Sequence, residues 1–116
     1  MIIPGTEATL FRRVFDGKPP TDLQKSMLQV LYGAYPERMT LDELAGRMGC
    51  SRGSLHGVLG TLSVRIPRDE FDARKREGLL LLPRKVDVFL RRDPYDWDQV
   101  RLTAAAFGVL EEKGLV

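Results

Sequence analysis

The chain has 116 residues, of which 43% are hydrophobic and 29% charged, and its net charge is +2. This size and composition are typical of one globular domain and exclude a disordered or fibrous chain. One cysteine and one histidine exclude an internal disulfide and leave no cluster of zinc ligands.

No apolar run approaches the roughly 18 residues of a membrane span, and the N-terminus lacks the charged-then-apolar layout of a signal peptide. We therefore expect a cytoplasmic protein with no membrane partner, no cofactor and no bound metal.

Positive charge is concentrated in the middle of the chain. Residues 65–92 contain nine Lys and Arg against five Asp and Glu, whereas residues 93–116 contain two against five. A local excess of this kind suits a polyanion better than a small neutral ligand. The alternative is a solvated surface with interspersed acids.

The first segment, 1–20, is assigned as an N-terminal extension ahead of a domain at 21–116. Its short apolar pattern, Leu10, Phe11, Val14 and Phe15, is sufficient for one or two helical turns. From 22 to 34, apolar residues recur at three- and four-residue intervals, which predicts a helix capped by Thr21 or Asp22.

Two short helices are predicted next, at 41–48 and at 51–63. Thr40 and Glu43 have the spacing of a capping box, in which each side chain satisfies the other residue's backbone amide. Gly49 stands where a helix end favours a left-handed residue, and Ser51 is a second N-cap. A turn of about three residues therefore joins the two helices.

The remaining segments predict a small β-hairpin and a last helix. Residues 68–78 are strongly charged and form either a short helix or a loop. Val86, Val88 and Leu90 alternate with Asp87, Phe89 and Arg91, which is the period of a strand. The stretch "DPYDWD" then predicts a turn, "QVRL" a return strand, and Thr103 caps a helix at 104–113 that ends at Gly114. The predicted fold class is mainly α with a small β-hairpin.

Residues 41–60, "LDELAGRMGCSRGSLHGVLG", resemble the helix-turn-helix DNA-binding motif. A small residue in the first helix lets two helices cross closely, and a turn glycine permits positive φ. The matching residues are the small Ala45, the turn Gly49, and the apolar Leu44, Met48, Cys50, Leu55 and Val58.

The flanking elements extend the resemblance over residues 21–116 to the winged helix-turn-helix superfamily. This resemblance implies a three-helix core, a hairpin wing and a C-terminal helix. It also implies that helix 51–63 enters the major groove of duplex DNA while the basic wing contacts the backbone. The charged insertion at 65–78 departs from the compact members and leaves the location of the wing open.

Three glycines interrupt the helix at 51–63, and each one inside a helix costs roughly 0.8 to 1 kcal/mol relative to alanine. At 100° per residue, Gly53, Gly57 and Gly60 gather on the side opposite the apolar stripe. A strip without side chains lets the backbone approach a partner closely. The partner is DNA or another protein, and an undistinguished surface is the remaining alternative.

The predicted DNA-binding residues combine this strip with its polar and basic neighbours. Arg52 has the chemistry to bind a guanine edge or a phosphate, and the serines have that of phosphate donors. His56 is a polar contact residue or a solvated side chain, and the basic pair after Pro83 either contacts phosphates or is a charged turn. The full set is Ser51, Arg52, Gly53, Ser54, His56, Gly57, Gly60, Arg84 and Lys85.

Little in the sequence supports catalysis. Cys50 occupies an apolar motif position, and the acidic residues of "DPYDWD" are explained by a turn. We therefore expect no enzyme and no catalytic residues. The predicted function is a transcriptional regulator that binds double-stranded DNA, as a monomer or a homodimer. The alternative is a winged-helix protein-protein interaction module in a nucleic-acid-processing complex.

Overall fold

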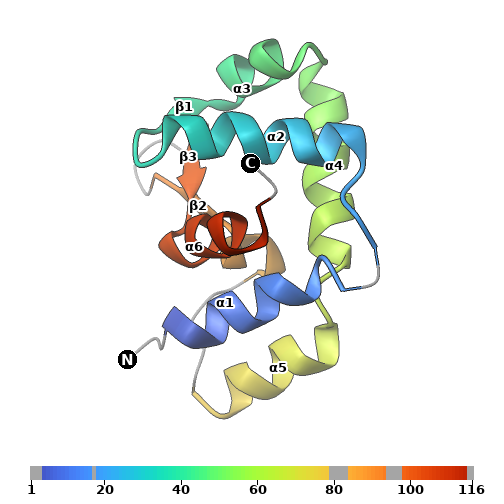
Figure 1. Ribbon diagram of the computed structural model, residues 1–116, viewed down its shortest axis with the longest axis vertical. Coiled ribbons are helices and arrows are strands. Elements are labelled where there is room, and N and C mark those ends of the chain that lie inside the picture. The colour runs from blue at the N-terminus through green and yellow to red at the C-terminus, as the bar shows by residue number, and fades with distance from the viewer. Residues whose placement is uncertain (1–3, 17, 79–83, 94–97, 115–116) are drawn as a thin grey trace.

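The computed structural model describes residues 4–16, 18–78, 84–93 and 98–114. These residues form six α-helices, one 3-10 helix and a small antiparallel sheet (Figure 1). In chain order the elements are α1 (Pro4–Arg13), α2 (Asp22–Ala34), β1 (Met39–Thr40), α3 (Leu41–Met48), α4 (Arg52–Val64), α5 (Arg68–Arg76), η1 (Lys85–Val88), β2 (Leu90–Arg92), β3 (Gln99–Leu102) and α6 (Ala104–Lys113).

The three strands are arranged in the order β1-β3-β2. β3 lies in the centre and pairs antiparallel with both neighbours, Val100 being opposite Met39 of β1 and Arg92 of β2. The class of fold predicted from the sequence, mainly helical with a small β element, is therefore confirmed. The sheet has one strand more than the predicted hairpin, namely β1. The sequence did not predict β1, because a strand of two residues leaves no periodic signal.

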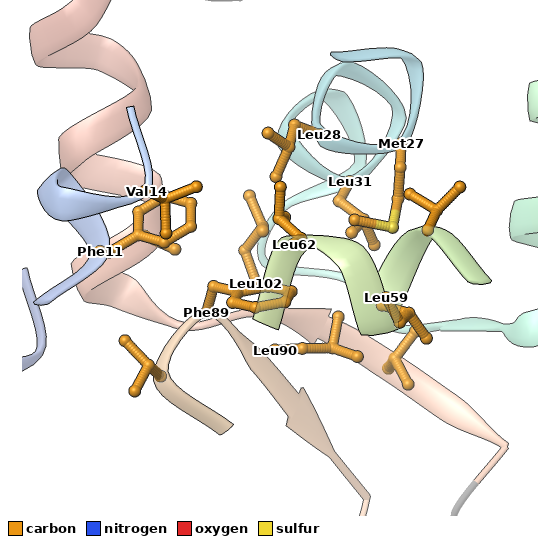
Figure 2. Close-up of a cluster of buried hydrophobic side chains, with 14 of the residues drawn as sticks. Phe11, Val14, Met27, Leu28, Leu31, Leu59, Leu62, Phe89, Leu90 and Leu102 are labelled. Carbon is orange, nitrogen blue, oxygen red and sulfur yellow. The ribbon is translucent and has the colours of Figure 1, made fainter. Parts of the chain in front are cut away.

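One hydrophobic core joins the helices to the sheet. Figure 2 shows side chains of α2, α4 and the β2 strand pointing toward one another. Burial of such side chains from water is the main favourable term in folding. The larger side chains that are almost fully buried are Leu10, Phe11, Met27, Leu28, Leu31, Leu44, Leu55, Leu62, Ile66, Phe89 and Leu90.

The helix ends follow the capping residues that the sequence contains. Thr21 and Gln24 form a complete capping box at the start of α2, and the hydroxyl of Thr103 accepts the amide of Ala106 in α6. Thr40 accepts the amide of Glu43, but the return bond from Glu43 is absent, so only half of that predicted box forms. The observed bounds of α2, α3 and α6 agree with the predicted ones, and α4 begins and ends one residue later than the predicted 51–63.

The N-terminal segment is part of the common core. Leu10, Phe11 and Val14 of this segment are buried, and the Phe11 and Phe89 rings have their centroids 5.7 Å apart. Arg12 joins α1 to α6 through a 2.7 Å ion pair with Glu112, whose pKa is lowered by the Arg12 hydrogen bond.

The predicted strand through 86–91 is confirmed at residues 90–91 and is wrong at residues 86–89. Residues 85–88 form the 3-10 helix η1, and β2 begins only at Leu90. The carboxylate of Asp87 accepts the backbone amide of Arg84 at 3.1 Å and closes this turn. Val88, Phe89 and Leu90 are all buried, because α1 covers the side that the alternating pattern assigned to solvent.

Two further segments complete the comparison with the sequence. The charged stretch after Pro67 adopts the helical alternative, as α5 from Arg68 to Arg76, with Phe71 as its buried residue. The predicted turn around 94–97 and the residues at 79–83 lie outside the described residues.

Candidate functional site

The outward face of α4 is bare, as the sequence predicts. Gly53, Gly57 and Gly60 are exposed, and a Cβ added at Gly57 or Gly60 would meet no atom within 4 Å. Val64, about three helical turns after Gly53, continues this face and is 76% exposed. We call these four residues the α4 strip. The opposite face packs into the core through Leu55, Val58, Leu59 and Leu62.

A tight turn positions α4 against α3. Gly49 has a φ of 72°, and its amide and that of Cys50 donate to the carbonyl of Ala45, which ends α3. The hydroxyl of Ser51 accepts the amide of Ser54 and donates to the Ser54 hydroxyl, each at 3.1 Å. Ser51 is thereby used in the cap, whereas the Ser54 hydroxyl keeps its proton for an external acceptor.

Arg52 forms ion pairs within the protein. Its guanidinium lies 2.6 Å from the carboxylate of Asp98 and 3.6 Å from that of Asp42. These pairs leave no signal in the sequence, because the two acids come from segments that only the fold brings beside α4. A bidentate contact between the Arg52 guanidinium and another group would compete with these two ion pairs.

A cationic cleft borders the α4 strip on the side of η1 and β2. Its first part has a volume of about 190 Å³, and Arg92 of β2 lies there beside His56 of α4. Arg92 has no carboxylate partner in the described part of the chain, and its Nε atom is buried without a hydrogen bond. The residues that line this part are His56, Leu59, Gly60, Ser63, Val86 and Arg92.

Arg92 is the residue that the sequence analysis left out of the site. It belongs to the basic run at 65–92, which is a signal in its favour. The side of the sheet to which the Arg92 side chain points depends on the strand register, since alternate residues of a strand face opposite sides. Placing Arg92 beside α4 therefore requires the pairing of Arg92 with Val100 in β3.

The second part of the cleft lies at the C-terminal end of α4 and has a volume of about 370 Å³. Lys85 donates from Nζ to the carbonyl of Ile66 at 3.0 Å, and Arg84 lies beside Asp87. Burial, and next the nearby charge of Arg68, lower the pKa of Lys85. The described lining residues are Ser63, Val64, Arg68, Phe71, Arg84, Lys85 and Val86, none of them acidic.

The positions of Arg84 and Lys85 differ from the predicted ones. Arg84 and Lys85 precede the β2-β3 hairpin instead of lying on it, because η1 intervenes between Pro83 and β2. The cation on the hairpin that faces α4 is Arg92.

An apolar groove borders the α4 strip on its other side, toward α2. The groove has a volume of about 580 Å³, and its rim carries Leu23, which is 43% exposed. Gln24 donates to the hydroxyl of Thr61 at 3.1 Å and holds the two helices together beneath it. The groove is lined by Thr21, Asp22, Leu23, Gln24, Ser54, Gly57, Val58 and Thr61.

The described ranges hold neither a cluster of metal ligands nor a helix suited to crossing a membrane. Nowhere in them do three or more His, Cys, Asp or Glu side chains gather as ligands for a metal ion. Among the helices of the described ranges, none has the length and apolar content needed to cross a membrane. Cys50 is half-buried against the core.

No protein-family model, curated protein or solved structure matches the chain. The features that bear on function are therefore the α4 strip, the cationic cleft on one side of it and the apolar groove on the other.

Proposed function

We propose that this protein binds duplex DNA as a winged helix-turn-helix transcriptional regulator, with α4 in the major groove and the β2-β3 hairpin on the backbone. The observation that carries the proposal is the bare α4 strip, bordered by a cleft whose described lining residues include four cations and no carboxylate. A backbone without side chains approaches base edges closely, and cations along one side bind phosphates.

The order of elements supports the proposal. α3 and α4 are joined by a turn of three residues, α2 precedes them, and an antiparallel hairpin and α6 follow. This is the arrangement that the resemblance to the winged helix-turn-helix superfamily implies. The insertion between α4 and β2 is occupied by α5 and η1. Because fold alone does not determine activity, the exposed residues carry the rest of the argument.

The residues around the α4 strip then have distinct roles. Ser54 donates to a phosphate near the start of α4, where the helix dipole favours an anion. His56 contacts the edge of the groove, and Arg92 binds a backbone phosphate from the hairpin. Arg84 and Lys85 add positive potential at the far end of α4.

Arg52 binds DNA in this proposal by exchanging partners. An exposed ion pair such as that with Asp98 is worth about 0.2 to 1 kcal/mol. A bidentate contact to a guanine edge is worth about 1 to 3 kcal/mol. The exchange is therefore favourable, and the ion pair holds Arg52 in place at the N-terminus of α4 until DNA displaces it.

The test is a selection from random duplex DNA at two salt concentrations, followed by affinity measurements on the selected sequence. Arg92→Ala is expected to weaken binding uniformly across sequences and to reduce the slope of log K against log salt by about 1. Arg76→Ala is the control, because Arg76 is an exposed arginine at the end of α5 that does not line the cleft. No enrichment and no binding at low salt would refute the proposal.

A second function is favoured by a different observation. The two large hydrophobic residues that are exposed in the described ranges, Leu23 and Val64, both lie beside or on the α4 strip. Apolar surface of this kind is typical of a protein-protein interface. A winged-helix interaction module in a nucleic-acid-processing complex, or a homodimer, would use the groove toward α2. Such a module would lose its partner on Leu23→Lys and would show no salt-dependent DNA binding.

A further inference from the structure

The cleft between the end of α4, α5 and η1 has the construction of a small-molecule site. We call it the α5-η1 cleft, and its volume of about 370 Å³ lies within the range of ligand pockets in proteins. The cleft combines three cationic side chains, Arg68, Arg84 and Lys85, with apolar walls. These residues come from two segments that are separated in the sequence, so the fold assembles the cleft.

The positive charge in this cleft is only partly neutralised. Arg68 has neither an ion pair nor a side-chain hydrogen bond within the described ranges, and Lys85 donates to the uncharged carbonyl of Ile66. Arg84 contacts Asp87 at 3.5 Å, a long separation for a charged hydrogen bond. Asp72 is the acid whose charge acts on Lys85.

The charges also repel one another. Burial and the charge of Arg68 both disfavour the protonated form of Lys85 and lower its pKa, while Asp72 acts in the opposite direction. A bound dianion would remove the repulsion, since it attracts both cations at once. Lys85 is held in place by the Ile66 carbonyl, so its remaining protons are available to a ligand.

Apart from the three cations and Ser63, the described residues that line the cleft are apolar. Phe71 is buried at 3% exposure, Val86 is half-buried, and Val64 is 76% exposed at the rim. Inorganic phosphate alone would leave these walls uncovered. A ligand with an apolar or aromatic body beside its anionic group would cover them.

We propose that the α5-η1 cleft binds a small organic phosphate, with the phosphoryl group between Arg68, Arg84 and Lys85 and an apolar body against Val64 and Val86. The ligand is bound reversibly, and no bond is made or broken. The cleft shares Val64, Arg84 and Lys85 with the proposed DNA interface. Binding of a small phosphate is nevertheless measured without DNA, so the two proposals can fail separately.

The experiment is a titration of the full chain with phenyl phosphate, followed by the backbone amide signals in NMR spectra. Saturable shifts are expected at Arg68, Lys85 and Val86. Inorganic phosphate should bind at the same residues more weakly, and benzyl alcohol should not bind. The pKa of the Lys85 amine should rise when phenyl phosphate is bound, because the dianion stabilises its charged form.

Two variants separate a built site from general attraction of anions. Arg68→Ala should weaken phenyl phosphate binding about tenfold or more, because it removes a charged hydrogen bond donor. Arg76→Ala, at the other end of the same helix, should bind like the original protein. Both side chains are exposed, so equal thermal melting temperatures will show that the fold is kept.

Several results would overturn the inference. These are the absence of saturable shifts, equal weakening by the two arginine variants, or equal binding of benzyl alcohol. A loss of DNA affinity in Arg68→Ala as large as that in Arg92→Ala would assign the cleft to the DNA interface instead. If phenyl phosphate binds as expected and no duplex is selected, the α5-η1 site stands and the proposed DNA-binding function fails.

Discussion

The two sides of α4 differ in chemistry although they border the same bare strip. Toward α2 the helix lies against an apolar groove with Leu23 on its rim, whereas toward η1 and β2 it lies against the cationic cleft that contains Arg92. A polyanion gains from the second side and not from the first, and a protein surface gains mainly from the first. The elements beside α4, and not α4 itself, therefore set the chemistry of each side.

The largest expected effect on DNA affinity comes from placing a bulky side chain on the α4 strip. Gly57→Leu should lower affinity for the selected duplex by at least as much as any single contact variant, because the added side chain lifts the whole helix away from the groove. The substitution should also stabilise the fold by up to about 1 kcal/mol, since Gly57 is helical and has open space around it. DNA affinity and thermal unfolding measure the two effects.

Gly108→Leu is the matched control for that variant. Gly108 lies inside α6, is exposed, and also has no atom within 4 Å of an added Cβ. The control should gain a similar stability and keep its DNA affinity. Equal loss of affinity in both variants would contradict the role of the strip.

The next effect concerns Arg52 at the N-terminus of α4. Arg52→Ala should weaken specific binding by about 0 to 2.8 kcal/mol, which is a guanine contact less the ion pair that is given up. Asp98→Asn should raise affinity, because it weakens the competing ion pair and removes a negative charge. Both are measured against the selected duplex and against a duplex of scrambled sequence.

A double-mutant cycle decides whether the two changes act through the same contact. The effect of Asp98→Asn should be smaller in the Arg52→Ala background, because only the contribution of the lost negative charge remains there. If it persists at full size, Asp98 acts on DNA through its own charge, and Arg52 is removed from the reading position.

The smallest effect is expected on the apolar side. Leu23→Gln should change DNA affinity by less than about twofold, because Leu23 makes no phosphate contact in the proposed complex and the substitution adds no charge. Its salt dependence should also stay the same. A loss as large as that of Arg92→Ala would show that DNA occupies both sides of α4, and the difference between them would then have no functional meaning.

The helices α2, α3, α4 and α6 were predictable because their signals are local. A threonine or serine cap before an apolar stripe, and a glycine such as Gly49 or Gly114 at positive φ after it, fix both ends within a few residues of sequence. The exposure of the glycines in α4 was predictable for the same reason, since it follows from the helical period alone.

The region around Phe89 was not predictable from local pattern. Its alternation with Val88 and Leu90 indicates a half-exposed strand, but Phe11 of α1 covers the second side. A period-2 pattern says which residues share a face and does not say how many faces are buried. The burial of Phe89 follows only once α1 is known to pack against it.

The sequence by itself determined the bounds of α2, α3 and α6, the course of α4 and the bare face that α4 presents, because caps and periodicity act over a few residues. Only the tertiary structure decided the partners of that face. In the structure Arg52 forms an ion pair with Asp98. Arg84 and Lys85 precede the hairpin, and Arg92 lines the same cleft as His56. Those contacts join segments far apart in the chain, and their geometry follows from strand register and from the packing of α1, which local signals do not contain.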